Sequence, residues 1–343
     1  MIKEKANINW NDLKFSYIKT DFRYLSFYKS GSWDNGELTK YNEIKINEGS
    51  PVLHYGQAAF EGLKAFTQKN GSIAIFRPDM NAKRLIISAN RILMPEISIE
   101  KFIDACCQVV KANYSWIPPY GFDASFYLRP YEIGVGENLG VKPANEYIFS
   151  VFGVPVGPYF KGGFKPVAMI VSEYDRAAPK GTGNVKVGGN YASSLLPHEY
   201  AVKNGYSDCI YLDPKDNKYI EEAGAANFFG ITKDGRFVTP KSSSILQSIT
   251  RISLMKIAED QLGLKVEETK IDIESLDQFT EVGACGTAAV ITPIGRIRYK
   301  DKEYLFYDKG NTAGPITSKL YHTLLSIQRG EIEDKYNWQY IVK

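Results

Sequence analysis

The sequence predicts a mixed protein of the α/β or α+β class with two unlike domains. Its 343 residues exceed the size of one ordinary hydrophobic core. Segments with strand-like patterns are interspersed with segments of helical apolar spacing along the chain. A stretch rich in glycine and proline near the middle is typical of a linker. We therefore expect a first domain over residues 1–156, a linker over 157–166 and a second domain over 167–343.

The first half is expected to contain a short strand, two helices and two further strands, in that order. The strand covers residues 72–76, after an Asn-Gly turn. A helix begins at Pro78 and stops before Pro95, because a proline ends a helical pattern that reaches it. Ser98 is the N-cap candidate of the next helix, whose apolar residues recur at helical spacing. The alternating segment 125–130 and the apolar run 147–156 are the further strands.

The second half is expected to begin with a strand near residues 167–172. Residues 191–203 are predicted to form a helix, in which Pro197 should remove a hydrogen bond and introduce a kink. Strands are expected over 208–213, 227–232 and 236–239, separated by turn residues. An amphipathic helix follows over 248–262, and Gly263 ends it.

Composition excludes several classes of function. The net charge is only +3, which gives no reason to expect nucleic acid or an anionic membrane as a partner. The 4 cysteines form no C-x-x-C pair and there are only 3 histidines, so we expect no metal site and no disulfide framework. No apolar run approaches the roughly 20 residues that span a bilayer, and the N-terminus has no apolar signal core. We expect a cytoplasmic protein that acts on small molecules.

Lys186 is the first candidate for chemistry. It lies between Gly181 and Gly183 on one side and Gly188 and Gly189 on the other, with little charge nearby. Glycine lets a backbone approach a ligand closely. A lysine amine with few solvating neighbours can act as a nucleophile, which is how an enzyme holds pyridoxal phosphate. Taken alone, this segment fits a surface lysine in a flexible loop better.

Pyridoxal phosphate would also need partners for its phosphate, its pyridine nitrogen and its phenolic oxygen. The Ser-rich loop that opens the helix at residue 248 is one phosphate candidate, because helix N-terminal N–H groups favour a dianion. The small residues of 285–289 are another. Glu222 is the carboxylate candidate for the nitrogen, whereas Glu221 is expected in a solvated turn. Each segment also has a purely structural interpretation, as an N-cap or a tight turn.

Tyr127 and Arg129 lie two residues apart and therefore on one face of the expected strand. A buried arginine beside a tyrosine suits a carboxylate ligand. A structural ion pair is the alternative for any single arginine.

Together these segments resemble a branched-chain-amino-acid aminotransferase of pyridoxal-phosphate fold-type IV, from about residue 55 to the C-terminus. The resemblance implies a small α/β domain, a larger pseudo-barrel domain and the cofactor pyridoxal 5′-phosphate. It makes Lys186 the Schiff-base lysine, Tyr191 the partner of the phenolic oxygen, and Glu222 the partner of the pyridine nitrogen. The implied phosphate contacts are Arg84, Ile249, Thr250 and Thr287.

The same resemblance implies a substrate pocket and a homodimer. The pocket residues of this chain are Phe60, Tyr127, Arg129, Tyr159, Thr287 and Ala288. Tyr55 and Val141 match residues that the family supplies from the neighbouring subunit.

The implied reaction is transamination of L-leucine, L-isoleucine and L-valine with 2-oxoglutarate, with Lys186 moving the proton. A D-amino-acid transaminase or an aminodeoxychorismate lyase of the same fold is the alternative. A nucleotide-binding module is disfavoured, because residues 134–140 miss the G-x-G-x-x-G spacing by one residue.

Overall fold

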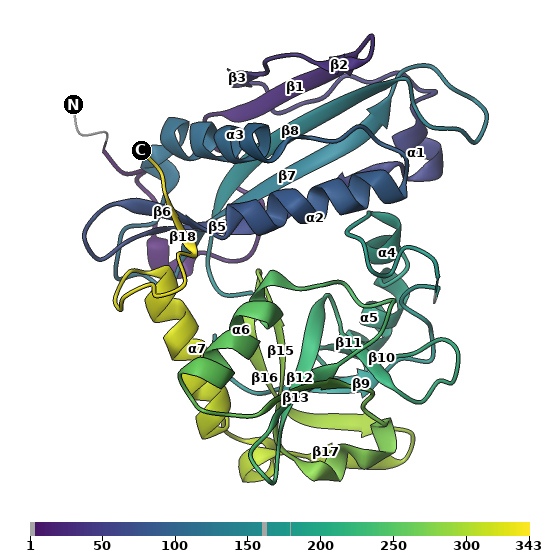
Figure 1. The fold of residues 1–343 in the computed structure, drawn as a ribbon, viewed down its shortest axis with the longest axis vertical. Helices are drawn as coiled ribbons and strands as arrows, with labels where there is room; N and C mark the ends of the chain where they lie inside the picture. The colour runs from purple at the N-terminus through teal and green to yellow at the C-terminus, as the bar shows by residue number, and fades with distance from the viewer. Residues whose placement is uncertain (1–3, 160–162, 179) are drawn as a thin grey trace. The chain divides into compact units, whose positions relative to one another are not determined.

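The computed structural model describes residues 4–159, 163–178 and 180–343, and these form two compact units. The first unit comprises the described residues up to 159 together with 185–188 and 326–343. The second comprises the described residues of 160–184 and 189–325. Figure 1 labels the main helices and strands of both units. Residues 160–162 of the expected linker lie outside the described part of the chain.

The first unit is built on an antiparallel sheet. Its strand order is β18 (Gln339–Ile341), β6 (Ile73–Phe76), β5 (Leu63–Thr67), β7 (Ser125–Val135), β8 (Glu146–Val156), β1 (Arg23–Lys29) and β2 (Ser32–Trp33). In addition, β3 (Glu37–Thr39) pairs with β1, and β4 (Ala58–Phe60) pairs with β7. The short helices are η1 (Trp10–Asp12), α1 (Pro51–Tyr55) and η2 (Tyr114–Trp116).

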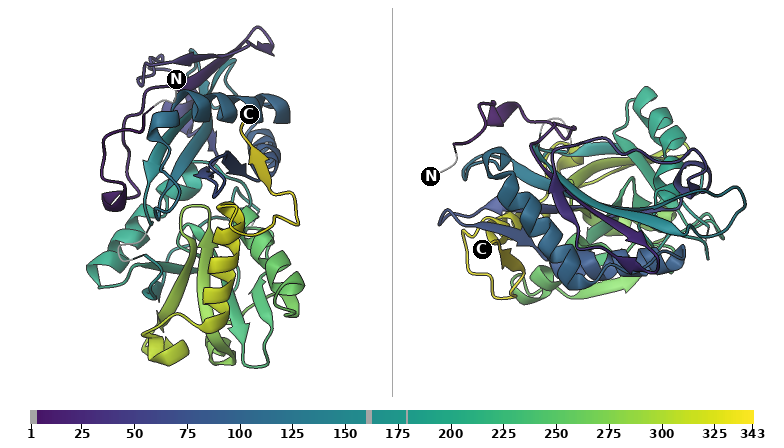
Figure 2. Two further views of the ribbon diagram at one scale, coloured as in Figure 1. Left: turned by 90° about the vertical axis from the view of Figure 1, so that its left-hand side faces the viewer. Right: turned by 90° about the horizontal axis from the view of Figure 1, so that it is seen from above.

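Two long helices cover one face of this sheet, as Figures 1 and 2 show. They are α2 (Pro78–Arg91) and α3 (Ile99–Ala112), and both lie where the sequence predicted them. Ser98 caps α3, because its hydroxyl accepts the N–H of Lys101 at 3.1 Å. The apolar faces of both helices pack on the sheet and form the core of the unit.

The second unit is a mixed sheet that closes on itself. Its strand order is β11 (Ile220–Ala223), β10 (Asp208–Leu212), β9 (Val167–Val171), β16 (Val290–Tyr299), β15 (Phe279–Gly286), β12 (Ala226–Thr232), β13 (Phe237–Pro240) and β14 (Val266–Thr269). Strand β17 (Lys302–Leu305) pairs with β16, and β11 also pairs with β12, which closes a barrel. The helices are α4 (Gly189–Ala192), α5 (Leu195–Lys203), α6 (Ile249–Asp260), η3 (Ile273–Gln278), η4 (Tyr307–Gly310) and α7 (Pro315–Gln328). The expected mixed α/β fold with a barrel in the second half is confirmed.

The expected helix over 191–203 is wrong in one respect. The structure has two helices there, α4 and α5, which are separated at Ser193 and Ser194. Pro197 is the third residue of α5. Because the N–H groups of a first helical turn have no intrahelical acceptor, proline removes no hydrogen bond at this position and no kink is needed.

The two units also differ from the expected division of the chain. Residues 185–188 and 326–343 belong to the first unit, although both segments were assigned to the second domain. The reason is hydrogen bonding to distant strands. Ala59 and Val187 form an antiparallel bridge, and β18 pairs with β6.

Glu132 is a buried carboxyl group on β7. Its side chain is 0% exposed, and neither carboxylate oxygen has a hydrogen-bond partner among the described residues. Burial raises the pKa of Glu132 to about 9. The folded protein therefore keeps a proton that the unfolded chain releases above the ordinary pKa of glutamate. Stability from this group is present below that ordinary value and is lost as the pH rises toward 9.

We expect Glu132→Gln to remove this pH dependence. In the wild type, one proton is held only by the folded state, so the unfolding free energy falls by about 1.4 kcal/mol for each unit that the pH rises. The amide of the variant cannot ionise and therefore lacks this pH dependence. Urea unfolding at pH 6, 7 and 8 measures the effect. The unfolding free energy of the wild type should fall relative to that of the variant over this range. Parallel pH profiles of the two proteins would contradict the prediction.

Candidate active-site residues in the two units

Lys186 belongs to the first unit, where hydrogen bonds hold its backbone. Its carbonyl oxygen accepts the N–H of Phe60 at 3.1 Å, and its own N–H donates to the hydroxyl of Ser88 at 2.9 Å. The neighbouring Val187 forms the bridge to Ala59 of β4. The backbone of Lys186 is thus attached to both β4 and α2, so its side chain starts from a fixed point.

Side chains predicted for the site gather around the ring of Phe60. The Nζ of Lys186 lies 4.7 Å from the centroid of that ring, and the guanidinium carbon of Arg129 lies 4.9 Å from it. Arg129 also donates through Nη2 to the hydroxyl of Tyr127 at 3.3 Å. An aromatic face attracts cations, so Phe60 favours this arrangement. The Nε of Arg129 is buried without a hydrogen-bond partner among the described residues, which leaves it a donor for a ligand.

An aromatic side chain that the sequence did not single out joins two predicted ones. The ring of Phe15 packs edge-on at 5.0 Å from that of Tyr127 and at 5.1 Å from that of Tyr159. Gly62 also contributes, because a Cβ there would lie 2.0 Å from the hydroxyl of Tyr127. Phe15 was missed because it stands in the N-terminal arm, outside every motif.

Helix α2 carries Arg84 and also contacts the Lys186 segment. The Nε of Arg84 lies 2.7 Å from a carboxylate oxygen of Glu61. One turn further on, Ser88 donates its hydroxyl to the carbonyl of Arg84 at 2.9 Å and accepts the N–H of Lys186. The first unit therefore connects the predicted phosphate arginine to the predicted Schiff-base lysine through one serine.

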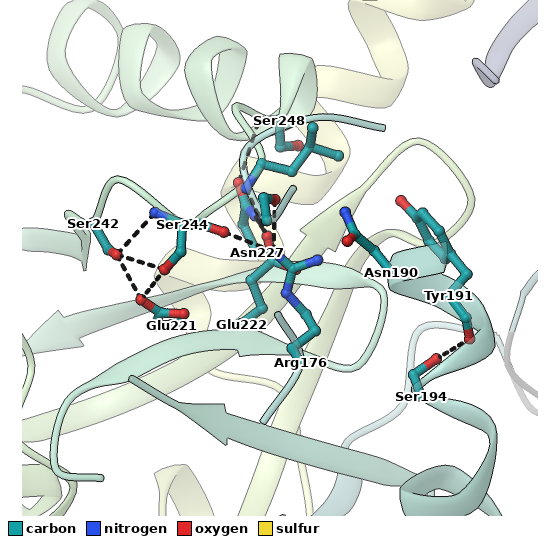
Figure 3. Close-up of polar contacts among 12 residues, drawn as sticks. Arg176, Asn190, Tyr191, Ser194, Glu221, Glu222, Asn227, Ser242, Ser244 and Ser248 are labelled. Atoms are coloured by element: carbon teal, nitrogen blue, oxygen red, sulfur yellow. Dashed lines mark hydrogen bonds and ion pairs between the residues drawn. The ribbon is translucent and has the colours of Figure 1, made fainter. Parts of the chain in front are cut away.

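Glu222 is the centre of a buried polar cluster in the second unit (Figure 3). Its Oε1 accepts the N–H of Leu246 at 2.9 Å and the amide N–H of Asn227 at 3.2 Å. The bond with Asn227 follows from barrel closure, since these residues are partners in the β11–β12 register. The Nε of Arg176 lies 2.9 Å from Oε2, as an ion pair rather than a well-directed hydrogen bond. These contacts stabilise the negative charge of the carboxylate.

Arg176 is a functional candidate that sequence reasoning missed. Its side chain is buried, and its Nη2 donates to the carbonyl of Gly183 at 2.7 Å and to that of Ser244 at 2.8 Å. It thereby joins Glu222 to two loops of the second unit. A Cβ at Gly183 would lie 2.3 Å from the carbonyl oxygen of Ser244, so glycine is required for this approach. A lone arginine after a strand carries no sequence signal for such a role.

Glu221 is not in a solvated turn, which corrects the expectation. It is buried and accepts the hydroxyl of Ser242 at 2.5 Å and that of Ser244. Strand β11 presents Glu221 and Glu222 to opposite faces, because successive side chains of a strand alternate. The serines that hold Glu221 lie some twenty residues away in the sequence, so local composition did not predict its burial.

The ends of the glycine-rich segment are tied together within the second unit. The hydroxyl of Thr182 donates to the side-chain oxygen of Asn190 at 2.6 Å, and the Asn190 amide donates to the Thr182 carbonyl at 2.7 Å. Tyr191 follows in α4, where its carbonyl accepts the hydroxyl of Ser194 at 2.7 Å (Figure 3). These two hydrogen bonds join residues on either side of Lys186 in the sequence.

The remaining predicted cofactor contacts of the second unit lie at a helix start and a turn. Ser248 is the N-cap of α6, since its hydroxyl accepts the N–H of Arg251 at 3.2 Å. Ile249 and Thr250 are the first residues of α6, where N–H groups lack intrahelical acceptors and the helix dipole favours an anion. Thr287 and Ala288 form the turn between β15 and β16.

Tyr55 and Val141 lie on the surface of the first unit. Val141 is 86% exposed and the neighbouring Leu139 is 90% exposed. Tyr55 is also exposed, and its hydroxyl donates to the carbonyl of Leu139. Such large exposed apolar side chains are typical of a surface that contacts another chain.

The donors present fit pyridoxal phosphate. Arg84 and the start of α6 suit its phosphate, a charged carboxylate at Glu222 suits its ring nitrogen, and Lys186 offers an amine. The glycines near Lys186 add to this fit. A Cβ at Gly188 would have only the Ala58 Cβ, at 4.0 Å, and one at Gly189 would have no described atom within 4 Å. Packing within the described residues therefore does not explain these glycines, whereas a ligand passing close to the backbone would.

Neither a membrane span nor a metal cluster is found among the described residues. None of the helices there has the length and apolar character needed to cross a bilayer. In the same part of the chain there is no group of three or more histidine, cysteine, aspartate or glutamate side chains that could hold a metal ion.

Comparison with known proteins points to one group of enzymes. The sequence pattern of the family described as "Amino-transferase class IV" matches residues 58–297. The branched-chain-amino-acid aminotransferase of Helicobacter pylori is 58% identical over 334 residues, which cover 97% of each chain. The Escherichia coli branched-chain amino acid aminotransferase structure superimposes with a TM-score of 0.81 at 31% identity, covering 95% of this chain and 100% of that one. The Thermobaculum terrenum enzyme of the same name, in its PLP-form, gives a TM-score of 0.77 at 25% identity, covering 95% and 99%.

Proposed function

The chain belongs to the class IV aminotransferase family, and from this premise we propose how it transaminates branched-chain amino acids. The enzyme exchanges the amino group of L-leucine, L-isoleucine or L-valine with 2-oxoglutarate and uses pyridoxal 5′-phosphate. One observation carries the proposal. Lys186 is pinned through its backbone to β4 and α2, and its Nζ lies over the ring of Phe60 beside Arg129.

The residues that match the family's cofactor contacts would hold pyridoxal phosphate. Its phosphate is bound by Arg84 and by the α6 start at Ile249 and Thr250, together with Thr287. Glu222 pairs with the ring nitrogen and Tyr191 with the phenolic oxygen. When bound, pyridoxal phosphate supplies an electron sink for the charge that develops at the α-carbon of the amino acid.

Lys186 performs the proton transfer. Its amine removes the α-proton of the bound amino acid as a general base and returns it as a general acid. This role needs a side chain whose origin does not move, and the hydrogen bonds to Phe60 and Ser88 provide that. Glu222 keeps its negative charge through the reaction, because Leu246, Asn227 and Arg176 all stabilise it.

The side chains around Phe60 account for the choice of substrates. Phe60, Tyr127 and Tyr159 offer apolar area for a branched aliphatic side chain. Arg129 binds the distal carboxylate of glutamate, and its buried Nε is a donor for that contact. The guanidinium carbon lies 4.9 Å from the ring centroid of Phe60 and 5.4 Å from that of Tyr127, and this attraction to aromatic rings holds the cation at the wall when leucine is bound. Thr287 and Ala288 are the remaining residues that the family resemblance assigns to substrate binding.

We also propose that the enzyme works as a homodimer. The exposed side chains of Tyr55 and Val141 then enter the substrate pocket of the neighbouring subunit. Their exposure, shared with Leu139, supports this assignment.

Arg129→Ala tests the substrate assignment. We expect kcat/KM for L-glutamate to fall about 100-fold, because a charged hydrogen bond to the distal carboxylate is lost. The value for L-leucine should change less than about 5-fold. Half-reactions followed by cofactor absorbance measure both, with D-alanine as the substrate of the rival activity. The proposal would be contradicted if Arg129→Ala lowered kcat/KM equally for L-glutamate and L-leucine. Faster turnover of D-alanine than of L-leucine by the wild type would also contradict it.

A further inference from the structure

Glu61 is a completely buried glutamate whose hydrogen bonds all lie within the first unit. It is 0% exposed and directly follows Phe60 in the chain. Its Oε1 accepts Arg84 Nε at 2.7 Å, and its Oε2 accepts Arg84 Nη2 at 2.8 Å. Oε2 also accepts the amide N–H of Asn81 at 2.7 Å and the N–H of Gly62 at 3.2 Å. A buried carboxylate is tolerated when it is paired and hydrogen-bonded in this way.

This pairing sets the orientation of the guanidinium. Glu61 engages the edge of Arg84 formed by Nε and Nη2, through two parallel hydrogen bonds. Nη1 points away from this edge, because the guanidinium is planar and its donors are in a fixed fork. Asn81 lies one helical turn before Arg84 on α2 and holds the same carboxylate. The carboxylate therefore ties the loop after β4 to two residues of α2.

We propose that Glu61 is a positioning residue, which aims the Nη1 side of Arg84 at the phosphate of the cofactor. The inference rests on the phosphate role given to Arg84 above and adds a residue to which no such role was assigned. Glu61 does not touch the phosphate itself. It converts a flexible arginine into a donor with one orientation, so less freedom is lost when the anion binds.

Glu61→Gln changes both the local charge and the orientation of Arg84, and these two changes should affect phosphate binding in opposite directions. The substitution removes a negative charge near the phosphate, which by itself would strengthen binding of the dianion. It also replaces one carboxylate oxygen with an NH₂ group. Both oxygens accept from Arg84, so either rotamer of the amide sets donor against donor and displaces the guanidinium. Orientation should prevail, because the phosphate contact requires a directed hydrogen bond and not only a nearby charge.

The test compares pyridoxal phosphate with pyridoxal, which lacks only the phosphate. Full-length wild type, Glu61→Gln, Arg84→Ala and the double variant are freed of cofactor and titrated with each compound by absorbance. Glu132→Gln is the matched control, because Glu132 is equally buried in the same unit and has no partner among the described residues that an amide would repel. Thermal melts of the cofactor-free proteins report folding separately.

We expect Glu61→Gln to weaken the binding of pyridoxal phosphate about 10- to 100-fold. The binding of pyridoxal should weaken less than about 3-fold. In the Arg84→Ala background the same substitution should have no further effect on pyridoxal phosphate, since the two residues act as a unit. Glu132→Gln should leave the ratio of the two affinities unchanged. This ratio does not respond to a general loss of stability, which affects both compounds alike.

Each of the following results would overturn the inference. Glu61→Gln could bind pyridoxal phosphate more tightly than the wild type, or lose affinity for pyridoxal phosphate and pyridoxal equally. The effects of Glu61→Gln and Arg84→Ala on the affinity for pyridoxal phosphate could also be additive. An Arg84→Ala variant that binds pyridoxal phosphate like the wild type would overturn it as well, while leaving the enzyme's use of the cofactor intact. A wild type that binds neither compound would refute the proposed cofactor and this inference together.

Discussion

Replacing Lys186 with alanine is expected to reduce kcat/KM for L-leucine by at least about 10⁴-fold. On the proposed function, the variant loses the amine that attaches to the cofactor and the base that moves the α-proton, and alanine offers no replacement for either. Steady-state transamination measures the activity. Borohydride reduction followed by mass spectrometry measures the attachment, which should be present on the wild type and absent from the variant.

Lys203→Ala is the matched control for this experiment. Lys203 is a surface lysine of α5 whose partner is the exposed Glu199. Its loss should leave activity and borohydride trapping unchanged, because exposed ion pairs contribute little. Trapping of the cofactor on Lys186→Ala, or activity within tenfold of the wild type, would refute the role of Lys186.

Glu222→Gln is expected to lower kcat/KM about 10²- to 10³-fold. The amide keeps an acceptor for Leu246 but carries no charge to pair with the protonated ring nitrogen, so the electron sink is weakened. The substitution also leaves the buried Arg176 without its counter-charge, which should cost about 3–5 kcal/mol of stability. Kinetics at a temperature where circular dichroism shows the variant folded separates the two effects.

Glu221→Gln is the control for position and burial. Glu221 is the adjacent residue, is also buried and is held by Ser242 and Ser244. It lies on the opposite face of β11, so its charge should matter for packing and not for the reaction. We expect its kcat/KM to stay within about 5-fold of the wild type. Similar activity losses in the two variants would mean that Glu222 acts only through the fold.

Much of the local structure was predictable because its causes are local. The helix after Pro78, the cap at Ser98 and the cap at Ser248 each depend on residues within one turn of each other. The incorrect prediction of a single helix over 191–203 also arose from local sequence. A periodic pattern does not reveal that a helix is interrupted at Ser193 and Ser194, and Pro197 was therefore placed in a helix interior rather than a first turn.

The candidate site was predictable only as a set of residues and not as an arrangement. Motif order and the resemblance singled out Lys186, Arg84 and Glu222. They did not indicate that a carboxylate holds Arg84 or that Arg176 holds Glu222. Each of these pairs joins segments that lie far apart in the sequence, and a lone arginine or glutamate looks the same whether it is solvated or buried.

The sequence by itself determined the fold class, the order of most elements and the family, and it supplied the residues proposed for the reaction. The tertiary structure decided the rest. It placed the glycine-flanked Lys186 directly before a β-bridge, by pairing Val187 with Ala59. It also buried Glu61 against Arg84. The physical reason is that secondary structure responds to neighbours within a few residues, whereas pairing and burial depend on strands and helices that only the folded chain brings together.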